Sequence, residues 1–256
     1  MSGESTFRGA GEVALLEQFD NHDGFRPRPS SVLDGRSLTL HLAEPAVELE
    51  LELGAGGNAR WRLGEERGEC PFEAFELRQG IVAVAARVDE RRSVFAVCAR
   101  ERGLAVLTEL ELGGDGGGGA GESSRYVQFG IDAPLAERFE PTAELVGKRV
   151  QWRYSSTHSF EHIYLNPTAY CWHCIEGPER WIGDVDPCVY YRLDQDLYLF
   201  AWSETVVPFN GAVAIDLRSG TSTGRFFGWD TEHAEIGQIV VGAYGTVLNE
   251  TVHVPA

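Results

Sequence analysis

The stretch Val47-Glu48-Leu49-Glu50-Leu51-Glu52-Leu53 alternates apolar and acidic side chains without a break. Successive side chains of an extended strand point to opposite faces, so this period of two predicts a strand with one buried and one solvated face. Similar short apolar segments, separated by turns, continue from Arg36 to the end of the chain. Strands spaced by about 8–12 residues predict an antiparallel meander that closes on itself. No long helical pattern accompanies them, so an α/β fold is not expected.

A faint internal repeat divides the chain into two units. Phe75-x-Leu77-x-Gln79-x-Ile81 matches Tyr191-x-Leu193-x-Gln195-x-Leu197. Such a self-match indicates two copies of one supersecondary unit. We therefore predict an N-terminal arm over residues 1–33 with a short helix, a first β-barrel over 34–132 and a second over 145–256. The glycine-rich run at 113–121 is interpreted as a hairpin loop inside the first unit.

Composition narrows the classes of function. The 256 residues are 43% hydrophobic and carry a formal net charge of −17. Hydrophobicity at that level excludes wholesale disorder, and the acidic balance argues against nucleic acid or anionic lipid as a partner. No apolar run reaches the roughly 20 residues of a membrane span, and the first residues do not resemble a signal peptide. We expect a cytoplasmic protein whose five cysteines are reduced.

Aromatic side chains concentrate in the second unit, and this concentration points to a ligand cavity there. Large aromatics in a small barrel are often core filler, but a cavity lined by Tyr and Trp also suits a planar, apolar ligand with a few oxygens. The matching part of the first unit, Val82-Ala83-Val84-Ala85, is bland, so the first barrel is expected to be structural. The candidate substrate-binding residues are Trp152, Tyr170, Trp172, Trp181, Tyr198, Phe200 and Trp202.

Strand parity singles out one carboxyl group. In the segment from Leu197 to Glu204, the even positions share one face. If Tyr198, Phe200 and Trp202 line the cavity, Glu204 stands at its end. A carboxyl in an aromatic, poorly hydrated site has a raised pKa, which suits a general acid or base near neutral pH. The alternative is an exposed carboxylate at a strand end.

Other polar groups in the second unit are weighed in the same way. Arg180 is either an anion-binding group or a surface arginine. In Cys171-Trp172-His173-Cys174 the two cysteines face opposite sides of a strand, so no metal is expected, and His173 is a candidate for acid–base chemistry. Asp184 and Asp186 are interpreted as turn residues, and Asn210-Gly211 as a hairpin turn. Glycine-rich phosphate-binding motifs are absent, and no cofactor is expected.

Several motifs of the second half resemble the C-terminal domain of the MoaF family (molybdenum cofactor biosynthesis protein F). They include Tyr170-Cys171-Trp172-His173-Cys174, Leu197-Tyr198-Leu199-Phe200-x-Trp202-x-Glu204, Val207-Pro208 and Phe227-Gly228. Gly35-Arg36-Ser37-Leu38 and its sequel resemble that family's N-terminal domain. The resemblance runs from about residue 30 to the end and is stronger in the second half.

The second unit is also similar, more distantly, to the phenolic acid decarboxylases, which are calycin-type barrels. Trp152-x-Tyr154 stands where that family has a Tyr-x-Tyr pair for the substrate carboxylate. Arg180-Trp181 and Trp202-Ser203-Glu204 are similar to its catalytic motifs. The resemblance implies catalytic roles for Glu204, Arg180 and Tyr154, and the Trp152 departure favours altered chemistry.

The sequence thus predicts an all-β fold of two tandem calycin (lipocalin-like) antiparallel barrels. The favoured function is a cofactor-independent lyase, isomerase or cyclase that acts on a small apolar or phenolic metabolite, as in bacterial secondary metabolism. Glu204 would be the general acid/base, Tyr154 and Tyr170 would orient an oxygen, Arg180 would hold an anion and His173 would relay a proton. The alternatives are a small-molecule carrier and a molybdenum-cofactor accessory protein. A homodimer is possible.

Overall fold

The computed structural model describes residues 25–111, 121–204, 209–230 and 235–252. These ranges contain sixteen strands and no helix, and so no helix there could cross a membrane. The helix expected at 12–19 and most of the glycine-rich loop lie outside the described residues.

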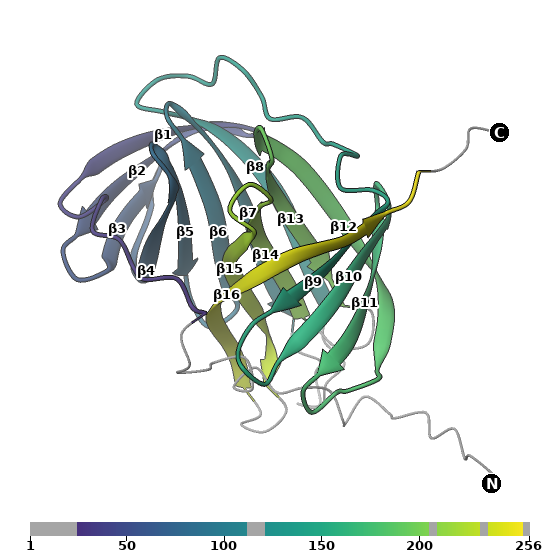
Figure 1. Ribbon diagram of the computed structural model, residues 1–256. Coiled ribbons are helices and arrows are strands. Elements are labelled where there is room, and N and C mark those ends of the chain that lie inside the picture. Colours follow the sequence, from purple (N-terminus) through teal and green to yellow (C-terminus); the bar gives the residue numbers. More distant parts are fainter. Residues whose placement is uncertain (1–24, 112–120, 205–208, 231–234, 253–256) are drawn as a thin grey trace, which may run out of the picture.

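The strands form two closed antiparallel barrels, which lie side by side in Figure 1. The predicted all-β fold of two tandem barrels is confirmed. The first barrel comprises β1 (Ser37–Ala43), β2 (Ala46–Gly54), β3 (Asn58–Leu63), β4 (Glu66–Arg78), β5 (Ile81–Arg87), β6 (Arg92–Ala99), β7 (Arg102–Glu111) and β8 (Gly121–Ile131). The second comprises β9 (Lys148–Arg153), β10 (Ser159–Asn166), β11 (Ala169–Glu176), β12 (Gly183–Asp194), β13 (Leu197–Ser203), β14 (Phe209–Asp216), β15 (Thr221–Asp230) and β16 (Glu235–Glu250).

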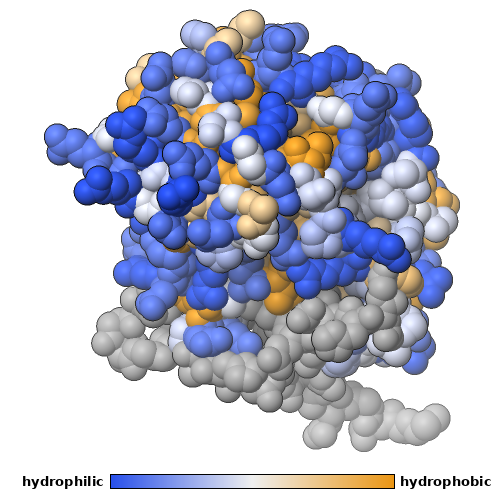
Figure 2. Space-filling model, turned by 90° about the vertical axis from the view of Figure 1, so that its left-hand side faces the viewer, coloured by the Kyte–Doolittle hydropathy of each residue, from blue (hydrophilic) through white to orange (hydrophobic). Residues whose placement is uncertain are grey.

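The alternating stretch of the sequence forms β2, with its leucines inside the first barrel. Leu49 and Leu51 pair with Leu40 and Leu38 of β1, and all four belong to one apolar cluster. The glutamates face outward, where Glu52 forms an ion pair of 2.9 Å with Arg60 of β3. Figure 2 shows this side of the molecule, mostly hydrophilic with apolar patches between the charged groups.

The two barrels meet through the outer faces of their walls. Small side chains on both sides, such as Ala83 and Ala85 of β5 and Ala212 and Ala214 of β14, are almost fully buried in one shared apolar cluster. Because alanine keeps the strands close together, the two sheets pack as in a β-sandwich. The interface is therefore a third apolar core, separate from the two barrel interiors.

Polar contacts fix the two barrels at this interface. The guanidinium of Arg78 donates two hydrogen bonds, of 2.8 and 2.7 Å, to the carboxylate of Asp216. The fully buried Arg225 donates to the side chains of Thr108 (2.7 Å) and Asn210 (2.6 Å). Thr108 in turn donates to Asn210 across 2.9 Å. A network that spans both barrels specifies how they dock.

Glycines in the second barrel make room for indole rings. A Cβ atom on Gly211 would lie 2.2 Å from the ring of Trp202, and one on Gly245 would lie 2.3 Å from the ring of Trp152. The turn predicted at Asn210-Gly211 is therefore wrong. Both residues lie within β14, because Gly211 accommodates Trp202 and Asn210 belongs to the buried interface network.

Candidate active site

One end of the second barrel carries a buried pair of carboxyl groups. Glu204 follows the last residue of β13, half-buried, and its Oε1 accepts a hydrogen bond of 3.2 Å from Nε1 of Trp202. Its side chain also hydrogen-bonds to Asp186 of the neighbouring strand β12. Strand parity thus places Glu204 where the sequence predicts it, beside an indole and next to a second carboxyl that was not expected.

Asp186 is the main residue that the sequence analysis misread. It lies within β12 rather than in a turn, pairs with Tyr170 of β11 and has no exposed surface. Its Oδ2 accepts a hydrogen bond of 2.9 Å from Nε1 of Trp172. The two carboxyl groups are therefore held between two indole N–H donors, one from β11 and one from β13.

This arrangement raises the pKa of Glu204 well above its usual value. Burial is the largest cause, followed by the negative charge of Asp186, the hydrogen bond between the two carboxyls and the charge of Glu179. The hydrogen bond from Trp202 acts in the opposite direction. Two adjacent carboxyls in a poorly hydrated site cannot both ionise easily, so the pair holds one proton more tightly than an isolated carboxyl does.

Aromatic rings complete a layer around this end of the barrel. Tyr154 lies edge-on to Phe160, with ring centroids 5.9 Å apart, and Phe160 lies 6.1 Å from Trp172. On the other side, Phe226 lies 5.8 Å from Tyr154 and 5.6 Å from Trp202. The ring of side chains closes through the two carboxyls. Burial raises the pKa of the Tyr154 phenol, so its hydroxyl stays protonated.

A second layer lies directly beneath. Tyr170 packs 5.6 Å from Trp202, and burial together with the charges of Glu204 and Asp186 raises its pKa. Next to it, the imidazole of His162 lies 5.2 Å from Tyr170 and 5.9 Å from Phe200. Burial lowers the pKa of His162 to about 3, and no hydrogen-bond partner reaches its Nδ1 among the described residues. It is thus a neutral imidazole with one nitrogen unused.

Deeper aromatics fill the barrel. Phe200 has no exposed surface and stacks 4.9 Å from Trp202 and 5.5 Å from Tyr190. Trp152 donates a hydrogen bond of 3.2 Å to the hydroxyl of Tyr164. These side chains support the site layer from below.

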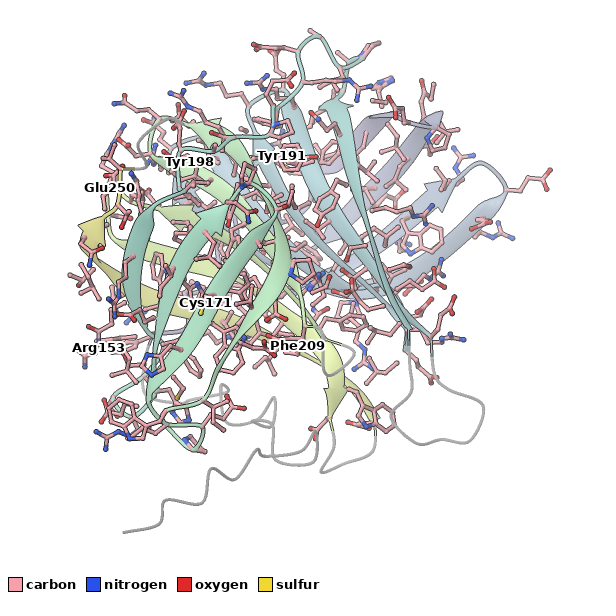
Figure 3. The ribbon with its side chains drawn as sticks, turned by 90° about the vertical axis from the view of Figure 1, so that its right-hand side faces the viewer. Arg153, Cys171, Tyr191, Tyr198, Phe209 and Glu250 are labelled. Atoms are coloured by element: carbon pink, nitrogen blue, oxygen red, sulfur yellow. The ribbon has the colours of Figure 1, made fainter. Side chains whose placement is uncertain are left out.

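Tyr198 lies at the opposite end of the barrel. Figure 3 shows Tyr198 and Phe209 toward different ends, and Phe209 lies 5.3 Å from Phe226 of the site layer. The Tyr198 hydroxyl donates a hydrogen bond of 2.8 Å to Glu144. Six residues of strand separate it from Glu204, a span of about 20 Å, so Tyr198 cannot contact a ligand at the carboxyl pair.

Three other predicted residues lie outside the barrel. Arg180 is exposed, with its guanidinium 4.5 Å from the ring of Trp181, which is itself 67% exposed. The imidazole of His173 stacks against Trp181, and its Nδ1 lies 3.8 Å from Glu161. Tyr170 and Trp172 face inward on β11, so alternation sends His173 outward. The expected convergence of Arg180 and His173 with Glu204 is not what the structure shows.

The described residues contain no group of three or more His, Cys, Asp or Glu side chains arranged to hold a metal ion. Cys174 faces the barrel interior, whereas Cys171 lies on the other face of β11. Their thiols are free. The separation of the two cysteines follows the strand alternation expected from the sequence.

Fold and site define a tandem β-barrel protein with a pair of adjacent carboxyl groups at one end of its second barrel. The chain matches the family models for the MoaF N-terminal domain over residues 13–111 and the MoaF C-terminal domain over 139–251. It is 30% identical to Protein MoaF of Klebsiella aerogenes, in an alignment that covers 99% of each chain. The chain belongs to the MoaF family.

Among solved structures, the protein is similar to a proposed beta-lactamase from Burkholderia vietnamiensis. The similarity covers 41% of this chain and 96% of that one, with 16% sequence identity and a TM-score of 0.36.

Proposed function

We propose that the second barrel is a cofactor-independent acid–base enzyme for a small apolar or phenolic molecule, with Glu204 as the group that transfers the proton. The observation that supports this most is the Asp186–Glu204 pair between the indole N–H groups of Trp172 and Trp202. A carboxyl that keeps its proton near neutral pH can act as a general acid. After it donates the proton, the N–H of Trp202 stabilises the carboxylate.

The phenols complete the chemistry. Tyr154 and Tyr170 are buried and protonated at neutral pH, because burial raises the pKa of each. Each hydroxyl can donate a hydrogen bond to an oxygen of the substrate and polarise it. The aromatic rings of the site layer keep water away, which strengthens these interactions.

The charges at this end favour an uncharged substrate. Arg180, the expected anion-binding group, lies outside the barrel against Trp181. A free carboxylate would approach Asp186, Glu204 and the nearby Glu179 without a cation from the described part of the site layer. Proton-coupled isomerisation, elimination or cyclisation of a neutral phenolic molecule therefore fits better than decarboxylation of an acid.

The test uses two probe reactions and two variants. We expect the protein to accelerate ring closure of 2′-hydroxychalcone, followed by absorbance, more than decarboxylation of 4-hydroxycinnamic acid. Glu204→Gln should lower kcat by about 100- to 10,000-fold and leave KM nearly unchanged. Glu144→Gln, at the far end of the same barrel, is the matched control and should behave as the wild type does. A Glu204→Gln variant with wild-type turnover would refute the proposal.

The molybdenum link in the relatives' name finds less support at this site. A pterin phosphate needs basic side chains, yet Arg192 is paired with Glu144 at 3.0 Å and Arg225 is buried in the interface between the barrels. The polar groups described in the site layer are carboxyls, phenols and indoles. An acidic site of this kind repels a phosphate.

A further inference from the structure

In the first barrel, side chains that face the interior are less buried than side chains that face the second barrel. In β6, Phe95 and Val97 face the second barrel and have no exposed surface. Their neighbours Val94 and Cys98 face the interior of the first barrel, yet they are only half-buried. Ala96, between them, retains 8% of its surface.

The neighbouring strand β5 shows the same reversal. Ala83 and Ala85 are 0% and 2% exposed on the outer face, whereas Val84 and Ala86 are half-buried on the inner face. The interior of a closed, packed barrel should be its most buried part. Because these inward side chains retain exposed surface, they line a lumen that side chains do not fill.

The opposite wall borders the same space. Leu51 of β2 and Trp61 of β3 are paired mid-strand residues that face inward, and both are half-buried. The thiol of Cys98 is deep enough that burial raises its pKa to about 12.

The sequence explains why this space exists. Alanine occupies many inward positions, and two of the inward rings lie against glycines. A Cβ on Gly68 would lie 2.7 Å from the indole of Trp61, and one on Gly103 would lie 2.2 Å from the ring of Phe129. Each ring thus follows the wall instead of crossing the lumen. The inward alanines are Ala59, Ala74, Ala86, Ala96 and Ala105.

The lining is apolar, with one unused donor. The inward positions of β2, β3, β5 and β6 from Leu49 to Leu53, Ala59 to Leu63, Val82 to Ala86 and Val94 to Cys98 carry no charge. The indole Nε1 of Trp61 is buried without a hydrogen-bond partner among the described residues.

We propose that the lumen of the first barrel binds a small, uncharged, apolar molecule. This site is separate from the carboxyl pair of the second barrel and does not depend on the reaction proposed there. It gives a binding function to the barrel that the sequence analysis expected to be structural.

The direct test is binding of Prodan, a neutral naphthalene ketone whose emission shifts to the blue in apolar surroundings. We expect blue-shifted emission that saturates with the full-length protein. Ala96→Phe and Val84→Phe, which fill the lumen, should each weaken binding by at least about tenfold. Glu50→Gln, on the outer face of β2, should bind as the wild type does.

A measurement without any probe guards against misfolded variants. Ala96→Leu adds volume to the lumen, whereas Ala83→Leu adds the same volume to the packed interface between the barrels. The first should unfold at or above the wild-type temperature, and the second clearly below it, since overpacking a filled core is destabilising. Lack of Prodan binding, equal binding by the filled variants, or equal destabilisation by the two leucines would overturn the proposal.

Discussion

Strand register relates the inward residues of the two barrels one to one. Val84 of β5 stands where Phe200 stands in β13, and Ala86 stands where Trp202 does, at the offset that also relates Phe75 to Tyr191. The wall is the same, but aliphatic and alanine side chains in the first barrel give way to stacked rings in the second. Closure of the sheet therefore does not depend on what fills it, and each interior is free to serve a different purpose.

The comparison also locates the chemistry. Asp186 corresponds to Cys70, and Glu204 corresponds to Val88. His162 corresponds to Leu51, because each pairs with the equivalent indole, Trp172 or Trp61. All three polar groups of the second barrel thus replace apolar residues of the first. We infer that the two interiors divide binding of an apolar molecule from acid–base chemistry.

The largest expected effect comes from truncating equivalent side chains. Phe200→Ala should destabilise the protein by about 3–5 kcal/mol, because it leaves a cavity in a fully packed core. Val84→Ala should cost less than about 1 kcal/mol, since the side chain already borders open space. Urea unfolding of both variants measures the difference. Equal losses would show that the two interiors are packed alike.

The next largest effect is a change in how strongly the stability of the folded protein decreases in acid. Burial lowers the pKa of His162 to about 3, while the unfolded chain takes up the proton near pH 6.5. Between these two pH values, the free energy of unfolding decreases by up to about 1.4 kcal/mol for each unit by which the pH falls. His162→Phe should remove this loss in thermal unfolding scans at decreasing pH. His41→Gln, a change in the first barrel, should retain it, and a wild-type pH profile for His162→Phe would contradict the placement.

Glu204 should affect stability in the opposite sense to His162, because its burial lowers the stability of the folded protein as the pH rises. The unfolded chain releases this proton near pH 4.3, whereas the folded protein holds it, because burial and the charge of Asp186 raise the pKa. Native stability is therefore lost as pH rises from that value toward the raised pKa. At neutral pH the free energy of unfolding of Glu204→Gln should exceed that of the wild type by on the order of 1 kcal/mol. In strong acid the two should be equal. A gain that is independent of pH would rule out this cause.

The smallest effect is expected at Arg180. Its exposed guanidinium contacts the ring of Trp181 outside the barrel. Arg180→Ala should change the free energy of unfolding by less than about 0.5 kcal/mol and leave turnover unchanged. A large loss of turnover with stability intact would place Arg180 back at the substrate, as the family resemblance implies.

Periodicity and the internal repeat were sufficient to predict the two barrels, because alternation in segments such as β2 leaves few alternatives. Parity likewise predicted Glu204 beside Trp202. Asp186 escaped because Gly183 and Pro187 resemble a turn, although the strand continues through both. The signal that could have found it is parity again, since 186, 188 and 190 share a face with the inward Tyr190.

Other errors have a common physical origin. His162 was not predicted to belong to the site, because a lone histidine in a strand does not reveal that aromatic rings surround it. Arg180 was grouped with Glu204 because of the resemblance to the phenolic acid decarboxylases, and His173 because it lies in the Cys171-Trp172-His173-Cys174 motif. A β-strand sends neighbours to opposite faces, so closeness along the chain does not bring His173 and Trp172 to the same site. The open lumen of the first barrel depends on packing that no sequence pattern displays.

The protonation state of Glu204 tests the central claim most directly. Infrared difference spectra between the wild type and Glu204→Gln, recorded over a pH series, report the C=O stretch of a protonated carboxyl. We expect this band to be present at neutral pH and absent from Glu204→Gln. In Asp186→Asn it should disappear at a lower pH than in the wild type, because the substitution removes a neighbouring charge that raises the pKa of Glu204. A Glu204 that is already ionised in weakly acidic solution would contradict the shared proton and the acid–base role built on it.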